Sequence, residues 1–217
     1  PGAEYAVSTP LSPPGTRHAP GTKHPARGTR WLDTMIAHPM QAGIAHGLNE
    51  RQILSHIEKI RKLNKKYPTM TILSGVELNI QGNGQPDIRN DVLKQLDVVI
   101  GSIHSGFKEP EATVTQRILT AMQNKNIDII GHPTGRIIQQ REPYNVNLAK
   151  IFDAAAATGT ALEINAFPSR LDLKDTDIRE AIARHVNLVI NSDAHATMHL
   201  DFLKFGIFQA RRGWAEK

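Results

Sequence analysis

The sequence predicts an α/β fold with a mostly parallel sheet, either open or closed into a barrel. Short apolar runs of strand type alternate with segments of helical periodicity over residues 50–212, which is typical of βαβ units. The runs are rich in Val, Ile and Leu, as expected for strands that are covered on both faces. Nearly every run also ends in a residue that can bind a metal ion, and strand ends are where α/β barrels place their active sites.

The first thirty residues differ from the rest of the chain. Residues 1–28 hold six of the thirteen prolines and show no period of helix or strand. Because the chain starts with Pro, we expect it to be a fragment of a longer protein. We therefore predict an irregular, disordered or aberrant start over residues 1–30 and one domain over residues 31–217.

The first regular element is predicted to be a helix beginning near residue 50. Asn49 followed by Gln52 resembles a capping box, and apolar residues then recur at helical spacing (Ile53, Ile57, Ile60 and Leu63). Strands are predicted over 71–78, 97–103, 127–130, 161–164 and 188–191. Further helices are predicted near 112–124, 147–158, 175–185 and 199–212, and Gly159 is expected to cap the second of these.

The composition excludes several kinds of site. The chain has no cysteine, so disulfides and thiolate metal sites are excluded, and a metal site must use nitrogen and oxygen ligands. No apolar run approaches the length of a membrane span, and we expect a cytoplasmic protein that does not bind a membrane. The net charge of +5 permits a polyanionic partner such as nucleic acid, although residues 1–30 contribute much of the excess.

The strand ends supply the candidate site. Five separate stretches contribute side chains that can bind metal or phosphate (Glu77, His104, His132, Asn165, Asp193 and His195). Each has a simpler explanation by itself, since a single His at a strand end is often structural and an Asp often caps a helix. A carboxylate such as Glu77 is costly to bury in an apolar strand unless it is paired or bound to metal. The pattern shared by the strands favours a metal centre, while His46 and His199 could lie at the surface or near the substrate.

These stretches resemble motifs of the PHP (polymerase and histidinol phosphatase) domain. The matching segments are Gly-Val-Glu at 75–77, Ser-Ile-His-Ser-Gly-Phe at 102–107, Gly-His-Pro-Thr-Gly-Arg at 131–136 and Ser-Asp-Ala-His at 192–195. Segments 162–166, 170–173 and 210–214 further resemble the C-terminal PHP domain of bacterial family X DNA polymerases. The resemblance covers the chain from about residue 36 to its end. It implies a distorted (β/α)7 barrel of the TIM type that binds two to three divalent metal ions at the strand ends.

The resemblance also implies a role for each ligand. Glu77 would bridge two metals, His104 and His132 would complete one site, and Asp193 would belong to the other. His195 and His38 would bind a third metal, and Ala37 replaces the Asp that precedes this His in the family. The family's first strand carries a His-x-His motif, and by spacing its two positions fall on Tyr5 and Val7. The first strand–helix unit is therefore atypical or missing, and one metal site should be weakened.

The activity that the resemblance implies is metal-dependent phosphodiester hydrolysis at DNA 3′ ends, by a 3′–5′ exonuclease or end-processing domain attached to upstream polymerase domains. Glu77, Asp193 and His195 would be catalytic, Mn²⁺ is the first expectation for the metal, and Zn²⁺ or Fe are alternatives. Arg136, Asn165 and Arg170 are candidate substrate contacts, because guanidinium groups pair well with phosphate oxygens. The alternative for each arginine is a surface salt bridge.

Three other readings remain open on the sequence alone. A small-molecule phosphatase of the histidinol-phosphate type would share the metal cluster. A catalytically impaired PHP module would explain the missing His-x-His motif. An amidohydrolase-type barrel would usually add a lysine after a strand near mid-chain, and none is present there.

Overall fold

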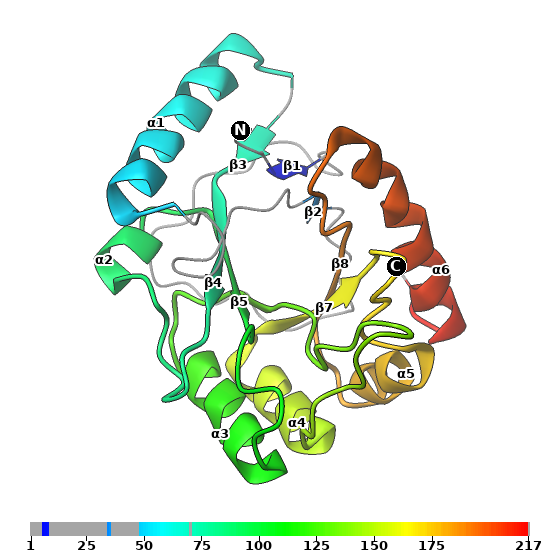
Figure 1. Ribbon diagram of the computed structural model, residues 1–217. Helices are drawn as coiled ribbons and strands as arrows, with labels where there is room; N and C mark the ends of the chain where they lie inside the picture. The colour runs from blue at the N-terminus through cyan, green and yellow to red at the C-terminus, as the bar shows by residue number, and fades with distance from the viewer. Residues whose placement is uncertain (1–5, 9–33, 36–47, 70, 217) are drawn as a thin grey trace.

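The computed structural model describes residues 6–8, 34–35, 48–69 and 71–216 (Figure 1). The predicted ligand His38 lies outside these ranges, as do Tyr5 and the stretch 9–33, in which the PHP resemblance expects a helix. Val7 is described in its backbone alone. The predicted boundary near residue 30 also falls outside the described residues.

Five strands form a parallel sheet whose spatial order follows the sequence: β4 (Gly75–Asn79), β5 (Val98–Ser102), β6 (Ile129–Ile130), β7 (Ala161–Asn165) and β8 (Leu188–Asn191). Successive strands are connected through α2 (Asn90–Leu93), α3 (Glu111–Met122), α4 (Leu148–Thr158) and α5 (Asp175–Ala183). Figure 1 shows α3, α4 and α5 outside the strands. The α/β fold with a parallel sheet that the sequence predicts is confirmed.

Three short strands form a second, antiparallel sheet in the order β2-β1-β3, with bounds Ala6–Ser8 for β1, Thr34–Met35 for β2 and Thr71–Leu73 for β3. β1 lies where the PHP resemblance expects the first strand, but it pairs antiparallel with both neighbours. β2 in turn contacts β8, at the far end of the parallel sheet.

The strand predicted over 71–78 is in fact two strands, β3 and β4, which belong to different sheets. The break occurs at Ser74, whose backbone N and Oγ donate to Asp97 Oδ2 at 2.8 Å and 2.7 Å. The carbonyl of Ser74 accepts from the backbone N of Asp97 and of Val98. The carboxylate of Asp97, the residue just before β5, thus accepts from Ser74 in place of a neighbouring strand. The chain passes at this point from the antiparallel sheet into the parallel sheet.

The helices agree closely with the sequence pattern. α1 (Glu50–Lys66) begins at the capping box of Asn49 and Gln52, and α4 ends at Gly159, whose φ of 78° suits a residue without a side chain. The last predicted helix is divided into a 3-10 turn, η1 (Thr197–Phe202), and α6 (Leu203–Arg212). Within the described ranges, no helix is both long and apolar enough to cross a membrane.

The two faces of the parallel sheet pack differently. One face carries Val99, Ile130 and Leu162, which belong to the large apolar cluster shared with the helices. The other face carries a small separate cluster of Val98, Ile100, Ile129 and Val189. Glu77 lies opposite Ile100 and Glu163 lies opposite Val189 in the strand register, so both carboxylates share this second face. The face turned away from the helices is therefore where the polar groups of the site gather.

Candidate metal centre at the strand ends

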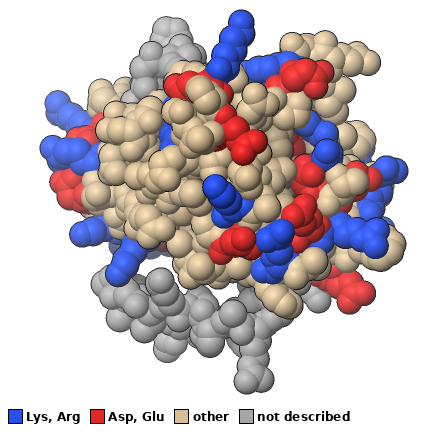
Figure 2. All heavy atoms as spheres, turned by 90° about the horizontal axis from the view of Figure 1, so that it is seen from below, with Lys and Arg blue, Asp and Glu red and all other residues tan. Residues whose placement is uncertain are grey.

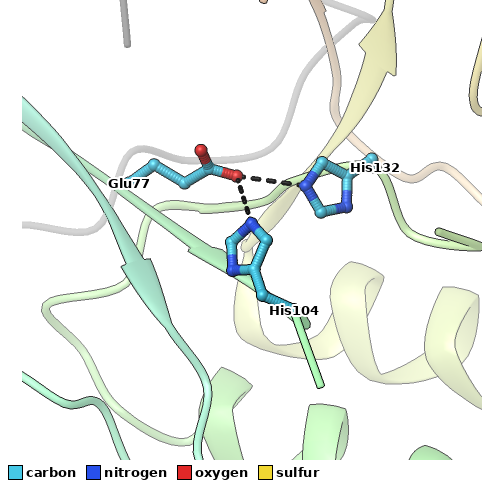
Figure 3. A group of neighbouring side chains, drawn as sticks. All are labelled: Glu77, His104 and His132. Atoms are coloured by element: carbon cyan, nitrogen blue, oxygen red, sulfur yellow. Dashed lines mark ion pairs between the residues drawn. The ribbon is translucent and has the colours of Figure 1, made fainter. Parts of the chain in front are cut away.

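Glu77, His104 and His132 form the candidate metal centre (Figure 3). Glu77 lies on β4, and each histidine lies two residues beyond the end of its strand, β5 for His104 and β6 for His132. The Nε2 atoms of His132 and His104 lie 3.1 Å and 3.4 Å from Glu77 Oε1. Glu77 and His132 are only 3% and 2% exposed. Glu77 in the middle of β4 and the two histidines just beyond the ends of β5 and β6 thus turn one carboxylate oxygen and two imidazole nitrogens toward the same point.

This donor set fits a divalent metal ion. Ligand atoms about 2.1 Å from a tetrahedral ion are roughly 3.4 Å apart, which is close to the separations seen here. Nδ1 of His132 is buried and has no hydrogen-bond partner. Only one of the two ring nitrogens, Nε2, has a polar partner in Glu77, so hydrogen bonds alone do not account for the burial of this ring. A nitrogen and oxygen set suits Mn²⁺, Zn²⁺ or Fe, as the absence of cysteine requires.

The backbone around His132 is arranged to bring its ring into the site. His132 has φ of 27°, a region that residues with side chains seldom adopt. At Gly131 an added Cβ would lie 2.3 Å from Ser102 Oγ, so the close approach of β5 and β6 requires glycine there. Burial is the largest single influence and lowers the pKa of His132, but the hydrogen bond to Glu77 and the negative charges of Glu77 and Glu163 together outweigh it, so the pKa of His132 is raised. Protons therefore compete with a metal for this ring.

Asp193 and His195 lie beyond β8 but do not join this group of three among the described residues. Asp193 Oδ2 accepts from Asn165 Nδ2 at 3.0 Å and is paired with Arg170 Nε at 3.3 Å. His195 Nδ1 lies 2.8 Å from the backbone carbonyl of Asp193 and 3.7 Å from its Oδ1. The structure thus brings Asp193 together with two of the predicted substrate contacts, Asn165 and Arg170.

The two candidate phosphate-binding arginines differ in their surroundings. Arg136 donates from Nε to the carbonyl of Arg170 at 2.8 Å and from Nη2 to the carbonyl of Leu171. Its guanidinium therefore braces the loop that carries Arg170. The Arg170 side chain is 19% exposed, and its partner Asp193 is buried, which is not the surface salt bridge considered as the alternative.

Sequence reasoning assigned no role to Glu163, which is 4% exposed in the middle of β7. Its carboxylate accepts from the backbone N of His132, from Asn165 Nδ2 at 3.2 Å and from Asn191 Nδ2 at 2.8 Å. Burial raises the pKa of Glu163 to about 7; the positive charge of His132 opposes this rise, and the carboxylates of Asp193 and Glu77 add to it. The signal was available, since Glu163 interrupts an apolar run in the same way as Glu77.

His199, whose position the sequence left open, lies beside His195. Its Nδ1 accepts from the backbone N of His195 at 3.1 Å. The ring also makes an edge contact with Phe167, with centroids 5.1 Å apart. His199 therefore lies on the same side of the molecule as the strand ends.

Comparisons with known proteins agree with these motifs. No protein-family model matches the chain. The DNA polymerase/3′-5′ exonuclease PolX of Bacillus subtilis (strain 168) is 42% identical over 179 residues, which is 82% of this chain and 31% of that protein. A probable phosphatase of Thermoanaerobacter sp. (strain X514) is 31% identical over 73% of this chain and 64% of its own length. A crystal structure of histidinol phosphate phosphatase from Lactococcus lactis, complexed with zinc, L-histidinol and phosphate, covers 80% of this chain with 18% identity and a TM-score of 0.48.

The chain spans about a third of the length of the Bacillus subtilis protein and under two thirds of the Thermoanaerobacter phosphatase. The similarity nevertheless extends over most of this chain, 82% of it for the Bacillus subtilis protein and 73% for the Thermoanaerobacter phosphatase. The chain is therefore a PHP-type domain related to the family X DNA polymerases, as the residues at its strand ends indicated.

Proposed function

We propose that this chain hydrolyses phosphodiester bonds at DNA 3′ ends with the help of divalent metal ions, as the 3′–5′ exonuclease or end-processing domain of a family X DNA polymerase. The observation that carries the proposal is the convergence of Glu77, His104 and His132, which come from three adjacent strands and the turns that follow them. The likeness to phosphatases and to PolX supports a metal-dependent phosphoesterase of the PHP type. The likeness to PolX in particular favours DNA as the substrate.

Glu77, His104 and His132 would hold the first metal, while Asp193, His195 and His38 would hold the further ions expected from the family. A divalent ion at such a site activates water for attack and offsets the negative charge that develops on the phosphate. Mn²⁺ is the metal we propose, with Zn²⁺ or Fe as alternatives. Burial of Glu77 and His132 keeps bulk water away from these ligands and strengthens their electrostatic interactions.

The residues around Asp193 would orient the substrate. Arg170 offers a guanidinium that can pair with phosphate oxygens, and its Nη1 is buried with no hydrogen-bond partner. Asn165 donates a hydrogen bond to Asp193 and so holds it in place. Arg136 donates to two consecutive backbone carbonyls, those of Arg170 and Leu171. The roles of Arg136 and Asn165 would then be to position Asp193 and Arg170 as well as to meet substrate.

We also propose that the strands form the distorted (β/α)7 barrel of the family. β3 leads directly into β4 at one end of the parallel sheet, and β2 contacts β8 at the other end. The antiparallel strands β1, β2 and β3 would thus bridge the two ends, and the first strand–helix unit would be the atypical part. In this arrangement the ends of β4 to β8 face one opening.

The surface charge bears on how DNA would bind. On the face shown in Figure 2, described basic and acidic side chains are interspersed, without a broad basic patch. This face offers DNA no broad basic surface, and we place the contacts to a DNA end at the strand ends, where Arg170 lies. Upstream polymerase domains of a parent chain would supply further contacts to the duplex, and the cytoplasm is the compartment that such a partner implies.

A small-molecule phosphatase is the second candidate, favoured by the likeness to probable phosphatases. A catalytically impaired module is the third, because Tyr5 and Val7 stand where the family carries its two histidines. One assay separates the three functions. The full chain with Mn²⁺ is given a 3′-labelled DNA and, separately, histidinol phosphate. Nucleotide release that chelator abolishes would support the exonuclease, phosphate release from the small ester alone would support the phosphatase, and no release from either would support the impaired module.

A further inference from the structure

Glu163 lies between the group of three candidate ligands and the residues around Asp193. It does not itself belong to the group of three. It shares with Glu77 the face of the sheet that is turned away from the helices, and its side chain is almost fully buried. A buried carboxylate is costly unless it is paired and hydrogen-bonded. Its partners therefore indicate what it does in this fold.

Each partner of Glu163 leads to a residue of the site. The backbone N of His132 donates to Oε2, which fixes the peptide on which the imidazole is carried. Asn165 Nδ2 donates to the same oxygen at 3.2 Å and to Asp193 Oδ2 at 3.0 Å, so it connects the two carboxylates. Asn191, which donates to Oε1 at 2.8 Å, lies two residues before Asp193 at the end of β8.

The two residues that Glu163 secures in this way are both in the left-handed region. His132 has φ of 27° and Asp193 has φ of 51°. Such conformations persist at functional sites only when the surrounding structure holds them. The hydrogen bonds that converge on Glu163 come from the backbone of one of these residues and from the neighbours of the other.

We propose that Glu163 is a positioning residue, whose carboxylate sets the backbone of His132 and, through Asn165 and Asn191, the side chain of Asp193 in the orientation that binds metal. The inference rests on the proposed metal centre and adds a residue that acts through the ligands rather than as one. Partners of this kind typically change metal affinity by about 10- to 100-fold when they are altered.

Two variants test this role. Glu163→Gln keeps the shape of the side chain and one acceptor oxygen, but it turns an N–H donor toward either Asn191 Nδ2 or the donors at Oε2. Combining Glu163→Gln with Asn191→Asp supplies an acceptor opposite the new amide and restores the full set of hydrogen bonds. Glu180→Gln is the matched control, because Glu180 is an exposed residue on α5 that pairs with Arg184.

The measurement is the Kd for Mn²⁺ by titration calorimetry, with circular dichroism and the Tm in chelator to establish that each variant is folded. We expect Glu163→Gln to weaken binding by about 10- to 100-fold, the double variant to recover to within about threefold, and the control to match the wild type. A Kd of Glu163→Gln within about threefold of the wild type would overturn the proposal. A folded double variant that binds as weakly as the single variant would also overturn it.

The Kd for Mn²⁺ can be measured whether or not the chain hydrolyses a substrate. A wild-type chain that binds Mn²⁺ but releases no nucleotide or phosphate would end the proposed function and leave the role of Glu163 to be decided by the Kd values. A wild-type chain that binds no Mn²⁺ would overturn both.

Discussion

The metal-free protein should lose stability as the pH rises from about 4.5 to about 7, because of Glu163. The pKa of this carboxyl is 4.5 for an ordinary glutamate and is raised to about 7 by burial in the folded chain. A group whose pKa is raised on folding binds more protons in the folded state, so its contribution is fully present below the unfolded pKa. That contribution is lost as the pH rises through the folded pKa.

The size of the effect follows from the shift. A difference of about 2.5 pH units at about 1.4 kcal/mol each corresponds to about 3.5 kcal/mol of stability in full, of which about 3 kcal/mol is lost across this window. Glu163 is only 4% exposed, so solvent screening removes little of this energy. Three N–H donors to the carboxylate reduce the loss without abolishing it, since burial is the larger influence.

The assay is urea unfolding in excess chelator at a series of pH values, for the wild type and for Glu163→Gln. The free energy of unfolding of the wild type, relative to the variant, should fall by about 3 kcal/mol between pH ~4.5 and pH ~7. Other groups titrate in both proteins and largely cancel in this difference. A difference that stays constant across the window would refute the burial argument for Glu163.

Three further predictions concern the site and the first helix. Gly131→Ala should weaken Mn²⁺ binding by about tenfold or more in titration calorimetry, because the added methyl would lie 2.3 Å from Ser102 Oγ. The control Gly82→Ala should bind Mn²⁺ as the wild type does, because there is open space around Gly82. Lowering the pH from about 8 to about 6 should weaken Mn²⁺ binding, because a proton competes for His132, whose pKa is raised; an affinity independent of pH would contradict this. Asn49→Ala should lower the free energy of unfolding by about 1 kcal/mol in urea titrations, because Asn49 Oδ1 caps Gln52 N at 3.0 Å, and an unchanged midpoint would show that the capping box contributes nothing.

Much of the fold could be predicted because its signals are local. α1 follows from its capping box and from Ile53, Ile57 and Ile60, which recur at helical spacing and are buried in the structure. The break at Ser74 could not be predicted in this way, because it depends on Asp97, which is 23 residues further along the chain. The short helix α2 gave no periodic signal, since four residues complete hardly more than one turn.

The same contrast between local signals and long-range contacts applies to the residues of the site. Glu77, His104 and His132 could be placed together from the sequence, because parallel strands bring their C-terminal ends to one edge. What could not be foreseen is that Asp193 would be held by Asn165 and Arg170, since those contacts depend on the path of the loop after β7. His38 lies outside the described residues, and its role stays a prediction.

The most direct test of the metal centre is the metal content of the purified chain, measured by inductively coupled plasma mass spectrometry after dialysis against trace Mn²⁺. Wild type and the exposed-site control Glu180→Ala should retain the same number of ions, at least one per chain, and Glu77→Ala should retain fewer, because it removes the oxygen shared by both histidines. A folded wild type without metal, or a Glu77→Ala variant that keeps its metal, would contradict the centre described here.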